Sequence, residues 1–330
     1  MTPLVSIITV NYNGMHDTCE MIDSFRRHET YPRYEIIVVD NGSRLPEAEK
    51  IQARYAAGYA SGSSVSDNLT AGSPALGSSV SGNPRVKVVR NINNGFAGGN
   101  NAGLKVARGD YLFFINNDTL IKEPILATLV RRIECNPQRT GGVSPMLKFA
   151  ARPDILQYAG FTPLSPITLR NAAIGFMQQD SPRFRVPCET ASLHGAAMLV
   201  SRQALQDAGP MTEVYFLFYE ELDWSAQIRK AGYRLWYEPA AVVYHKEGMT
   251  ARRGSRCGSF TCRVHVYCLP AGTCGASGNA CHVPTSAFLP PPKRQPHTFC
   301  TDRRHLPKLR YTALTKEYYS LRTDEFVYSH

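Results

Sequence analysis

The sequence predicts an α/β protein with a Rossmann-like, mostly parallel central sheet flanked by helices. Within residues 1–115, short apolar runs alternate with stretches of helical periodicity, the pattern of strands joined by crossover helices. The 330 residues are 43% hydrophobic and 19% charged, a globular composition that excludes a disordered protein. No window approaches the roughly 18 consecutive apolar residues of a membrane-spanning helix. The opening MTPLVSIITVNYNG has no basic region or cleavage site, so we interpret it as a core strand rather than a signal peptide.

The expected elements follow from the spacing of apolar residues. Four short runs are rich in β-branched and aromatic residues and are expected to be strands: residues 4–10, 34–39, 86–89 and 111–115. One helical face is indicated by the spacing of Met15, Cys19, Ile22 and Phe25. Further helices are expected at residues 46–55 and 101–107.

Two segments interrupt this pattern. Residues 57–84 are rich in Gly, Ser and Ala without an apolar period, which indicates a flexible low-complexity insertion in a domain covering residues 1–250. Residues 251–330 carry eight of the ten net positive charges and six of the nine cysteines. These cysteines form no CxxC pair, which disfavours a zinc site. We expect a poorly structured Cys- and Arg-rich tail, disordered or aberrant, such as a translated frameshift. Because the charge lies in this tail, no nucleic-acid partner is expected.

Polar residues follow each of the four expected strands. The residues in these clusters that we take as ligand-binding candidates are Asn11 and Asn13, then Asp40, then Asn94 and Gly98, then Asn116 and Asp118. Asn, Asp and Gly also form turns and helix caps, which would explain any single cluster. Four clusters at the carboxyl ends of parallel strands meet at one edge of the sheet, where α/β proteins bind ligands. The sequence therefore predicts a polar ligand site at this edge.

The residue types at this edge suit a nucleoside diphosphate. The carboxylate of Asp40 can accept hydrogen bonds from a base or a ribose. The glycine-rich segment 94–103 lacks GxGxxG spacing, which disfavours a dinucleotide fold, but it permits close approach of a ligand and leads into a helix N-terminus suited to an anion. Asp118 is a candidate ligand for Mg²⁺ or Mn²⁺, whose remaining charge a diphosphate would balance.

A second group of chemically active residues lies downstream. Glu221 shares a helical face with Trp224 and Ile228 and is expected to point inward, whereas Asp223 falls on a polar face. Acids also favour a helix N-terminus through the macrodipole, which is the alternative explanation for both residues. A strand expected at residues 241–244 ends in His245, a candidate metal ligand.

Seven ordered motifs in this chain resemble those of family 2 glycosyltransferases, which have the GT-A fold. They are VSIITVNYNG, VVDNGS, RNINNGFAGGNNAG, FINNDT, LHGAAMLVSR, FYEELDWSAQIRKAGY and VVYHKEG. Within this family, the motif sequences are most similar to those of the rhamnosyltransferase-like branch. The resemblance covers about residues 3–250 and includes neither residues 57–84 nor the tail.

The resemblance implies an inverting transfer of a sugar from a nucleoside diphosphate-sugar to a hydroxyl, and the branch that the motifs resemble implies rhamnose as that sugar. Asp40 matches the nucleotide-binding Asp, and Asn116 to Asp118 match the DXD-type motif, with Asn116 near the ribose. Glu221 matches the general base, although this chain has Glu-Glu where the family usually has Glu-Asp, so Asp223 is the alternative. His245 matches a second metal ligand, and His194 a segment that lines the donor sugar and acceptor. We further expect Arg252 and Arg253 to close over the phosphates.

The resemblance also implies the partners and leaves two rival functions. The expected partners are the nucleoside diphosphate-sugar and a saccharide or lipid-linked acceptor of cell-surface polysaccharide synthesis. The expected location is the cytoplasm, with peripheral contact of the basic tail at the inner face of the membrane. A sugar-phosphate nucleotidyltransferase would require a basic residue in the loop NYNGMHD, which has none. A non-catalytic binding relative would have no need of Glu221, Asp118 and His245.

Overall fold

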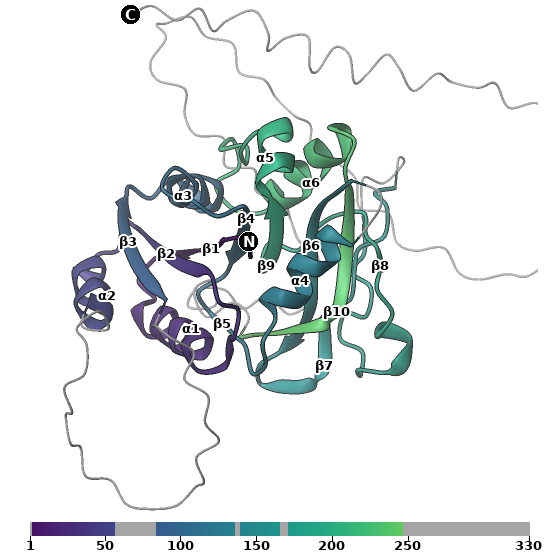
Figure 1. Ribbon diagram of the computed structural model, residues 1–330, viewed down its shortest axis with the longest axis horizontal. Helices are drawn as coiled ribbons and strands as arrows, with labels where there is room; N and C mark the ends of the chain where they lie inside the picture. Colours follow the sequence, from purple (N-terminus) through teal and green to yellow (C-terminus); the bar gives the residue numbers. More distant parts are fainter. Residues whose placement is uncertain (1, 57–83, 136–138, 166–170, 247–330) are drawn as a thin grey trace, which may run out of the picture. The chain divides into compact units, whose positions relative to one another are not determined.

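The computed structural model describes residues 2–56, 84–135, 139–165 and 171–246, which belong to one compact unit (Figure 1). The expected insertion at 57–84 lies almost wholly outside the described residues. The expected tail at 251–330, with Arg252 and Arg253, lies entirely outside them. In the part of the chain that is described, no helix combines the length and the apolar character needed to cross a bilayer.

Helices and strands alternate along the first half of the chain, as the sequence predicts. The helices are α1 (Met15–His28), α2 (Glu47–Ala56), α3 (Gly95–Leu104), α4 (Leu126–Glu134), α5 (Arg202–Ala208) and α6 (Glu220–Lys230), with a short 3₁₀ turn, η2 (Pro182–Phe184). The strands are β1 (Val5–Asn11), β2 (Tyr34–Asn41), β3 (Arg85–Asn91), β4 (Tyr111–Ile115), β5 (Thr119–Leu120), β6 (Thr140–Phe149), β7 (Arg152–Tyr158), β8 (Cys188–Glu189), β9 (Ala197–Ser201) and β10 (Arg234–His245).

The strands form a single mixed sheet with the order β3-β2-β1-β4-β9-β6-β10-β5. The predicted parallel arrangement is confirmed in the first part of the chain, where β3, β2, β1 and β4 run parallel. The sheet then reverses at β9, which is antiparallel to both β4 and β6. Strands β6 and β10 are again parallel, while β7 adds to β6 and β8 and β5 add to β10 in antiparallel pairs. Only the last part of β10 matches the strand expected at residues 241–244.

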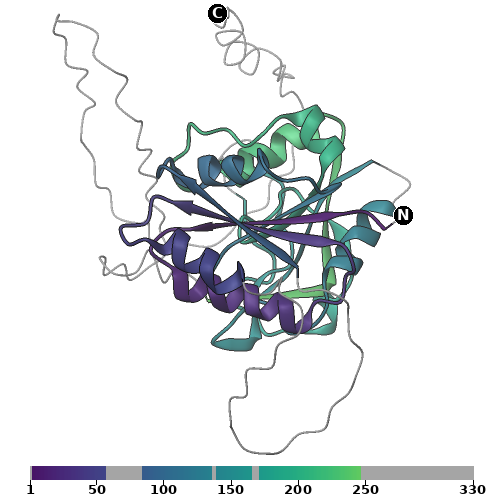
Figure 2. The same cartoon turned by 60° about the vertical axis from the view of Figure 1, so that its left-hand side comes forward.

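Helices cover both faces of the sheet (Figure 2). Each face has its own apolar core. On one face, α1, α2 and α4 pack their buried residues, among them Phe25 and Leu129, against strand residues such as Ile7. On the other face, α3, α5 and α6 pack buried residues that include Trp224 against Ile8. The adjacent residues Ile7 and Ile8 serve opposite cores because side chains alternate across a strand. This alternation gives the layered α/β architecture.

Helix α3 corrects one expectation from the sequence. A glycine loop followed by a helix at 101–107 was expected, but α3 begins at Gly95 and contains the glycines themselves. Glycine disfavours a helix interior by about 1 kcal/mol relative to alanine. Tertiary packing overrides that preference here, because a Cβ at Gly99 would lie 2.9 Å from Val10 and a Cβ at Gly103 would lie 2.5 Å from Ile8. The glycines allow α3 to lie directly on β1.

Adding one methyl group at Gly103 should therefore destabilise the protein. Its Cβ would meet the branched, buried side chains of Ile8 and Val39, which have little freedom to move. We expect Gly103→Ala to lower the free energy of unfolding by about 1–3 kcal/mol despite the better helix propensity of alanine. Urea unfolding measures the effect, with the exposed Lys105→Ala as the matched control in the same turn. Equal or greater stability of Gly103→Ala would contradict this account of α3.

Candidate active site

The polar residues at the ends of β1, β2 and β4 are joined by one chain of hydrogen bonds. The Asn11 amide Nδ2 donates to Asp40 Oδ1 at 3.1 Å and to Glu47 Oε2 at 2.9 Å. Its Oδ1 accepts a hydrogen bond from the Thr18 hydroxyl at 2.7 Å. Asn117 Nδ2 donates to the same hydroxyl at 3.0 Å. The three strand ends are thereby fixed beside one another, and we call this set the polar rim: Asn11, Asp40, Asn116, Asn117 and Asp118.

Asp40 keeps one carboxylate oxygen available for a ligand. The side chain is 7% exposed, and its Oδ1 accepts hydrogen bonds from Asn11 and from the Ser43 hydroxyl. Its Oδ2 makes no hydrogen bond within the described ranges. Asn13 shapes the adjoining turn, and its expected role in ligand binding stays a prediction. It has a φ of 52°, its N–H donates to Ser43 Oγ and its Oδ1 accepts from the N–H of Arg44 at 2.8 Å.

Asp118 and His245 come together from opposite ends of the domain. His245 Nε2 lies 3.1 Å from Asp118 Oδ1, and Asn116 Nδ2 lies 3.5 Å from the same nitrogen. The backbone N–H of Lys246 donates to Asp118 O at 2.9 Å and holds the two segments together. Burial raises the pKa of Asp118, but the hydrogen bond and charge of His245 outweigh it, so the net shift is downward. A carboxylate oxygen and an imidazole nitrogen facing each other fit a divalent cation.

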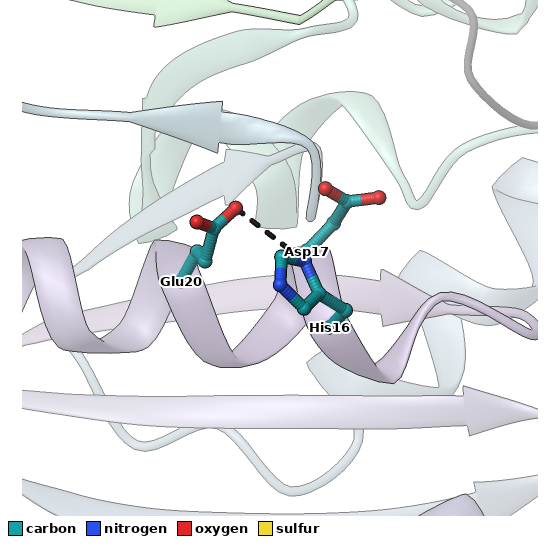
Figure 3. A group of neighbouring side chains, drawn as sticks. All are labelled: His16, Asp17 and Glu20. Carbon is teal, nitrogen blue, oxygen red and sulfur yellow. Dashed lines mark ion pairs between the residues drawn. The ribbon is translucent and has the colours of Figure 1, made fainter.

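A second cluster of potential metal-binding atoms lies in the first turns of α1 (Figure 3). There His16 Nδ1 is 3.6 Å from Glu20 Oε2. The Lys246 ammonium donates to Asp17 Oδ1 at 2.6 Å and also to Glu20. Because this ammonium already pairs with both carboxylates, we interpret the cluster as a clamp that holds the end of β10, and with it His245, beside α1.

Glu221 is linked to the polar rim by the segment 194–196. A Cβ placed on Gly195 would lie 3.6 Å from the Glu221 carboxyl carbon, so the two are in contact. The next residue, Ala196, accepts a hydrogen bond at its carbonyl from the Asn116 N–H at 3.0 Å. Asn116 is two residues before Asp118. The predicted base and the predicted metal ligands therefore lie on adjoining segments.

The two acids at the start of α6 are unlike each other. Glu220 is 4% exposed, and its Oε2 is buried without a hydrogen-bond partner among the described residues. Burial and the neighbouring charge of Glu221 raise the pKa of Glu220 to about 8. Burial also raises the pKa of Glu221, although the N–H groups of Glu221 and Leu222 act in the opposite direction. Asp223, the alternative base, accepts a hydrogen bond from Gln227 in the next turn at 2.7 Å.

His194 lies within a cluster of aromatic rings. Its imidazole stacks on Phe161, with ring centroids 5.8 Å apart, and meets Tyr158 edge-on at 5.1 Å. Its Nδ1 accepts a hydrogen bond from the Ala196 N–H at 3.1 Å. Burial, with a smaller contribution from His245, lowers the pKa of His194 to about 3. The imidazole is therefore neutral, with its proton on Nε2.

Asn94 and Gly98 make contacts within the protein. Asn94 Oδ1 accepts from Asn91 at 2.8 Å and its Nδ2 donates to Glu213 at 3.4 Å. A Cβ at Gly98 would lie 2.1 Å from the Asn94 amide, so glycine makes room for that side chain. Their expected role in donor binding stays a prediction. Asn101 also donates a hydrogen bond to Glu213, at 2.9 Å. Helix α3 therefore anchors the segment that leads to α6.

That segment carries an exposed aromatic stretch directly before Glu220. Phe216, Phe218 and Tyr219 are each at least 40% exposed, and the Phe216 carbonyl accepts a hydrogen bond from Phe96 N–H at 3.0 Å. Phe218 and Tyr219 have φ values of 73° and 74°. Such left-handed backbone costs about 1–2 kcal/mol for a residue with a side chain, and it is found preferentially at functional sites.

Sequence reasoning missed three residues of the site. Gln157, whose Oε1 is 2.8 Å from His245 Nδ1, belongs to β7, a strand that the sequence did not predict. Lys246 was given no role. Glu220 was given no role, although two consecutive acids before a buried helical face were a signal that one of them would be desolvated.

Comparison with known proteins identifies relatives for the chain. The model of the family described as glycosyl transferase family 2 matches residues 6–207. The glycosyltransferase GlyG of Streptococcus pneumoniae is 27% identical over 135 residues, which are 41% of this chain and 36% of that protein. The uncharacterized glycosyltransferase EpsJ of Bacillus subtilis is 30% identical over 136 residues, which are 41% of this chain and 32% of that protein. The match thus spans about a third of the length of these relatives.

Solved structures show the same fold. A crystal structure of GalNAc-T7 with UDP, GalNAc and Mn²⁺ superposes with a TM-score of 0.56 at 17% identity, covering 74% of this chain and 44% of that one. The mannosyltransferase PcManGT from Pyrobaculum calidifontis, in complex with GDP-Man and Mn²⁺, gives a TM-score of 0.51 at 18% identity, covering 76% and 59%. These likenesses confirm the GT-A fold expected from the sequence.

The buried acid Glu220 should make the stability of the protein depend on pH. Its pKa is raised from an ordinary 4.5 to about 8 in the folded state, so the folded chain holds this proton more tightly than the unfolded chain. The stabilisation is complete below the ordinary pKa and is lost as the pH rises through 8, at roughly 1 kcal/mol per pH unit. Glu220→Gln should lose less stability than the wild type between about pH 5 and about pH 8.5.

Thermal unfolding at both pH values measures this difference. The exposed Glu123→Gln serves as the matched control, because it removes one carboxylate without removing a buried one. Parallel pH profiles for the wild type and Glu220→Gln would show that Glu220 is not a buried neutral acid.

Proposed function

The chain belongs to glycosyl transferase family 2, and from this membership we propose that it transfers a sugar, with inversion, from a nucleoside diphosphate-sugar to a hydroxyl of a saccharide or lipid-linked acceptor. The observation that carries the proposal is the connected site at the carboxyl ends of the parallel strands. A free oxygen of Asp40, the Asp118–His245 pair and the half-buried acid Glu221 are brought onto adjoining segments there. These are the groups that such a transfer needs.

The donor is proposed to lie along the polar rim. Asp40 Oδ2 would accept hydrogen bonds from the nucleoside, and the amide of Asn116 lies beside the metal-binding pair. The neutral imidazole of His194, with its proton on Nε2, would donate a hydrogen bond to the diphosphate-sugar. A neutral hydrogen-bond donor of this kind orients an anionic ligand without bringing a second titrating charge into the site. The sequence motifs resemble those of the rhamnosyltransferase-like branch, and this resemblance favours a rhamnose donor.

Asp118 and His245 would hold the divalent cation, Mg²⁺ or Mn²⁺. The residues fit such an ion, because a carboxylate with a lowered pKa and an imidazole nitrogen face each other 3.1 Å apart. When bound, the ion supplies Lewis-acid stabilisation of the charge on the leaving diphosphate. Asp118 and His245 themselves supply one negative charge, so the diphosphate is needed to complete the neutralisation of the site.

Glu221 is proposed as the general base that removes the proton from the attacking hydroxyl. Its carboxylate is held at the start of α6 against Gly195, and burial raises its pKa toward the range where a base is effective. The usual acid at this position of the family is Asp, so Glu221 reaches one methylene further. A Cβ at Gly195 would lie 3.6 Å from the Glu221 carboxyl carbon, so this backbone packs beside the longer side chain in ordinary van der Waals contact.

The acceptor is proposed to approach over the aromatic stretch that precedes α6. Phe216, Phe218 and Tyr219 present exposed rings on the segment leading to the base. Aromatic faces bind the apolar faces of sugar rings, which suits a saccharide acceptor.

Incubation with a panel of nucleoside diphosphate-sugars tests the function, with the products read by mass spectrometry. We expect release of a free nucleoside diphosphate by transfer or slow hydrolysis, loss of that activity in EDTA and its recovery on addition of Mn²⁺ or Mg²⁺. Pyrophosphate as a product would instead identify a nucleotidyltransferase. Binding of donors without turnover would identify a binding protein, and activity indifferent to EDTA would remove Asp118 and His245 from a metal-binding role.

Replacing the proposed base should separate binding from transfer. Glu221→Gln keeps the size of the side chain but cannot take up a proton, so we expect transfer to fall by about 10²–10⁴-fold while donor affinity is retained. Kinetics with the best donor of the panel and calorimetric titration of that donor measure the two properties. Asp223→Asn is the matched variant, since it neutralises an acid two residues away whose carboxylate is engaged with Gln227. An inactive Asp223→Asn beside an active Glu221→Gln would reverse the two roles.

A further inference from the structure

Gln157 is the side chain that faces the far side of the His245 imidazole. Its Oε1 lies 2.8 Å from His245 Nδ1, while His245 Nε2 lies 3.1 Å from Asp118 Oδ1. Gln157 and His245 are 6% and 7% exposed, so the contact is shielded from water. The three side chains form a row: amide, imidazole and carboxylate.

A β-bulge places Gln157 in this row. In the pairing of β6 with β7, Leu147 lies opposite Tyr158 and Lys148 opposite Leu156, which leaves Gln157 as an extra residue without a partner. The same residues of β6 pair on their other side with β10, where Phe149 lies opposite His245. Gln157 therefore reaches His245 across β6. Bulges re-aim side chains in this way and are common beside functional sites.

The hydrogen bond determines which imidazole nitrogen carries the proton. An amide oxygen can only accept, so His245 must donate to it through Nδ1–H. In the neutral imidazole this leaves the Nε2 lone pair directed at the Asp118 carboxylate. Two electron-rich atoms 3.1 Å apart repel each other unless a proton or a cation lies between them.

We infer that Gln157 is a positioning residue that holds His245 in the Nδ1–H tautomer, so that Nε2 and Asp118 are ready to bind a divalent cation. The inference rests on the cation of the proposed function but not on sugar transfer. Outer hydrogen-bond partners of metal-binding histidines act in this way, and their loss typically weakens metal binding by about 10–100-fold.

Titration of the full-length protein with Mn²⁺ alone, followed by electron paramagnetic resonance, tests the inference without any donor or acceptor. Gln157→Leu removes the acceptor at similar size and should weaken Mn²⁺ binding by about 10–100-fold. Gln157→Glu keeps an acceptor, can only accept, and should bind Mn²⁺ at least as tightly as the wild type. Gln52→Leu is the matched control, because it removes the same group from the exposed face of α2 and should leave binding unchanged.

The ¹⁵N chemical shifts of the histidine rings give a second reading that does not depend on metal affinity. With the His245 signals assigned from their loss in His245→Ala, we expect Nδ1 to carry a proton in the wild type and in Gln157→Glu, whether or not a second proton lies between Nε2 and Asp118 in the absence of a cation. Gln157→Leu should show a mixture of tautomers.

Several results would overturn the inference: Mn²⁺ binding of Gln157→Leu at wild-type affinity, binding of Gln157→Glu as weak as that of Gln157→Leu, absence of Mn²⁺ binding by the wild type, or a wild-type Nδ1 without a proton. If Gln157→Leu fails to fold, the glutamate variant and the wild-type spectrum still decide. A protein that binds Mn²⁺ as expected but transfers no sugar would refute the proposed function and leave this inference standing.

Discussion

The hydrogen bonds of one buried amide, that of Asn11, are the constraint on which the rest of the site depends. Parallel pairing sets Asn11 directly opposite Asp40, and both ends of the amide are occupied, by Asp40 and Glu47 on one side and by Thr18 on the other. A buried polar group left without a partner costs about 1–3 kcal/mol, so this arrangement has few alternatives. Because Asn117 bonds to the same hydroxyl, the ends of three strands move as one unit. The donor site can therefore be rigid although its residues are distant in the sequence.

The start of α6 shows the opposite balance between stability and function. Glu220 is desolvated without a full set of partners, and Phe218 and Tyr219 adopt left-handed backbone before it. Each of these features lowers stability, and the packing of Trp224 and Ile228 in the core below offsets them. A carboxylate with a raised pKa requires such an environment, since water would return the pKa to its ordinary value. The loss of stability at the start of α6 and the proposed basicity of Glu221 therefore have the same cause, which is the removal of these carboxyl groups from water.

The reversal of the sheet at β9 brings the two halves of the site together. Strand β9 pairs with β4 on one side and β6 on the other, so β6 and its partner β10 extend the same sheet. This extension carries His245 to Asp118, and the bulge in β7 adds Gln157 from the far side of β6. Lys246 then ties the end of β10 to Asp17 on α1. The parallel half supplies the proposed nucleotide-binding side of the site, and the mixed half supplies the imidazole of His245.

The amino-acid sequence was enough to predict the parallel half of the fold and the polar residues at its edge. Short apolar runs correctly located β1, β2, β3 and β4. Polar residues that follow three of these strands form the polar rim. Both features can be predicted because the spacing of side chains and the end of a strand depend on the local sequence. The start of α3 was misjudged because its glycines have poor helix propensity, and only contact with Ile8 and Val10 reveals why they are needed. The antiparallel half, the burial of Glu220 and the contact of Gln157 with His245 were decided by tertiary structure. Each depends on which segments lie side by side, and a bulge or a desolvated acid arises only once that packing exists.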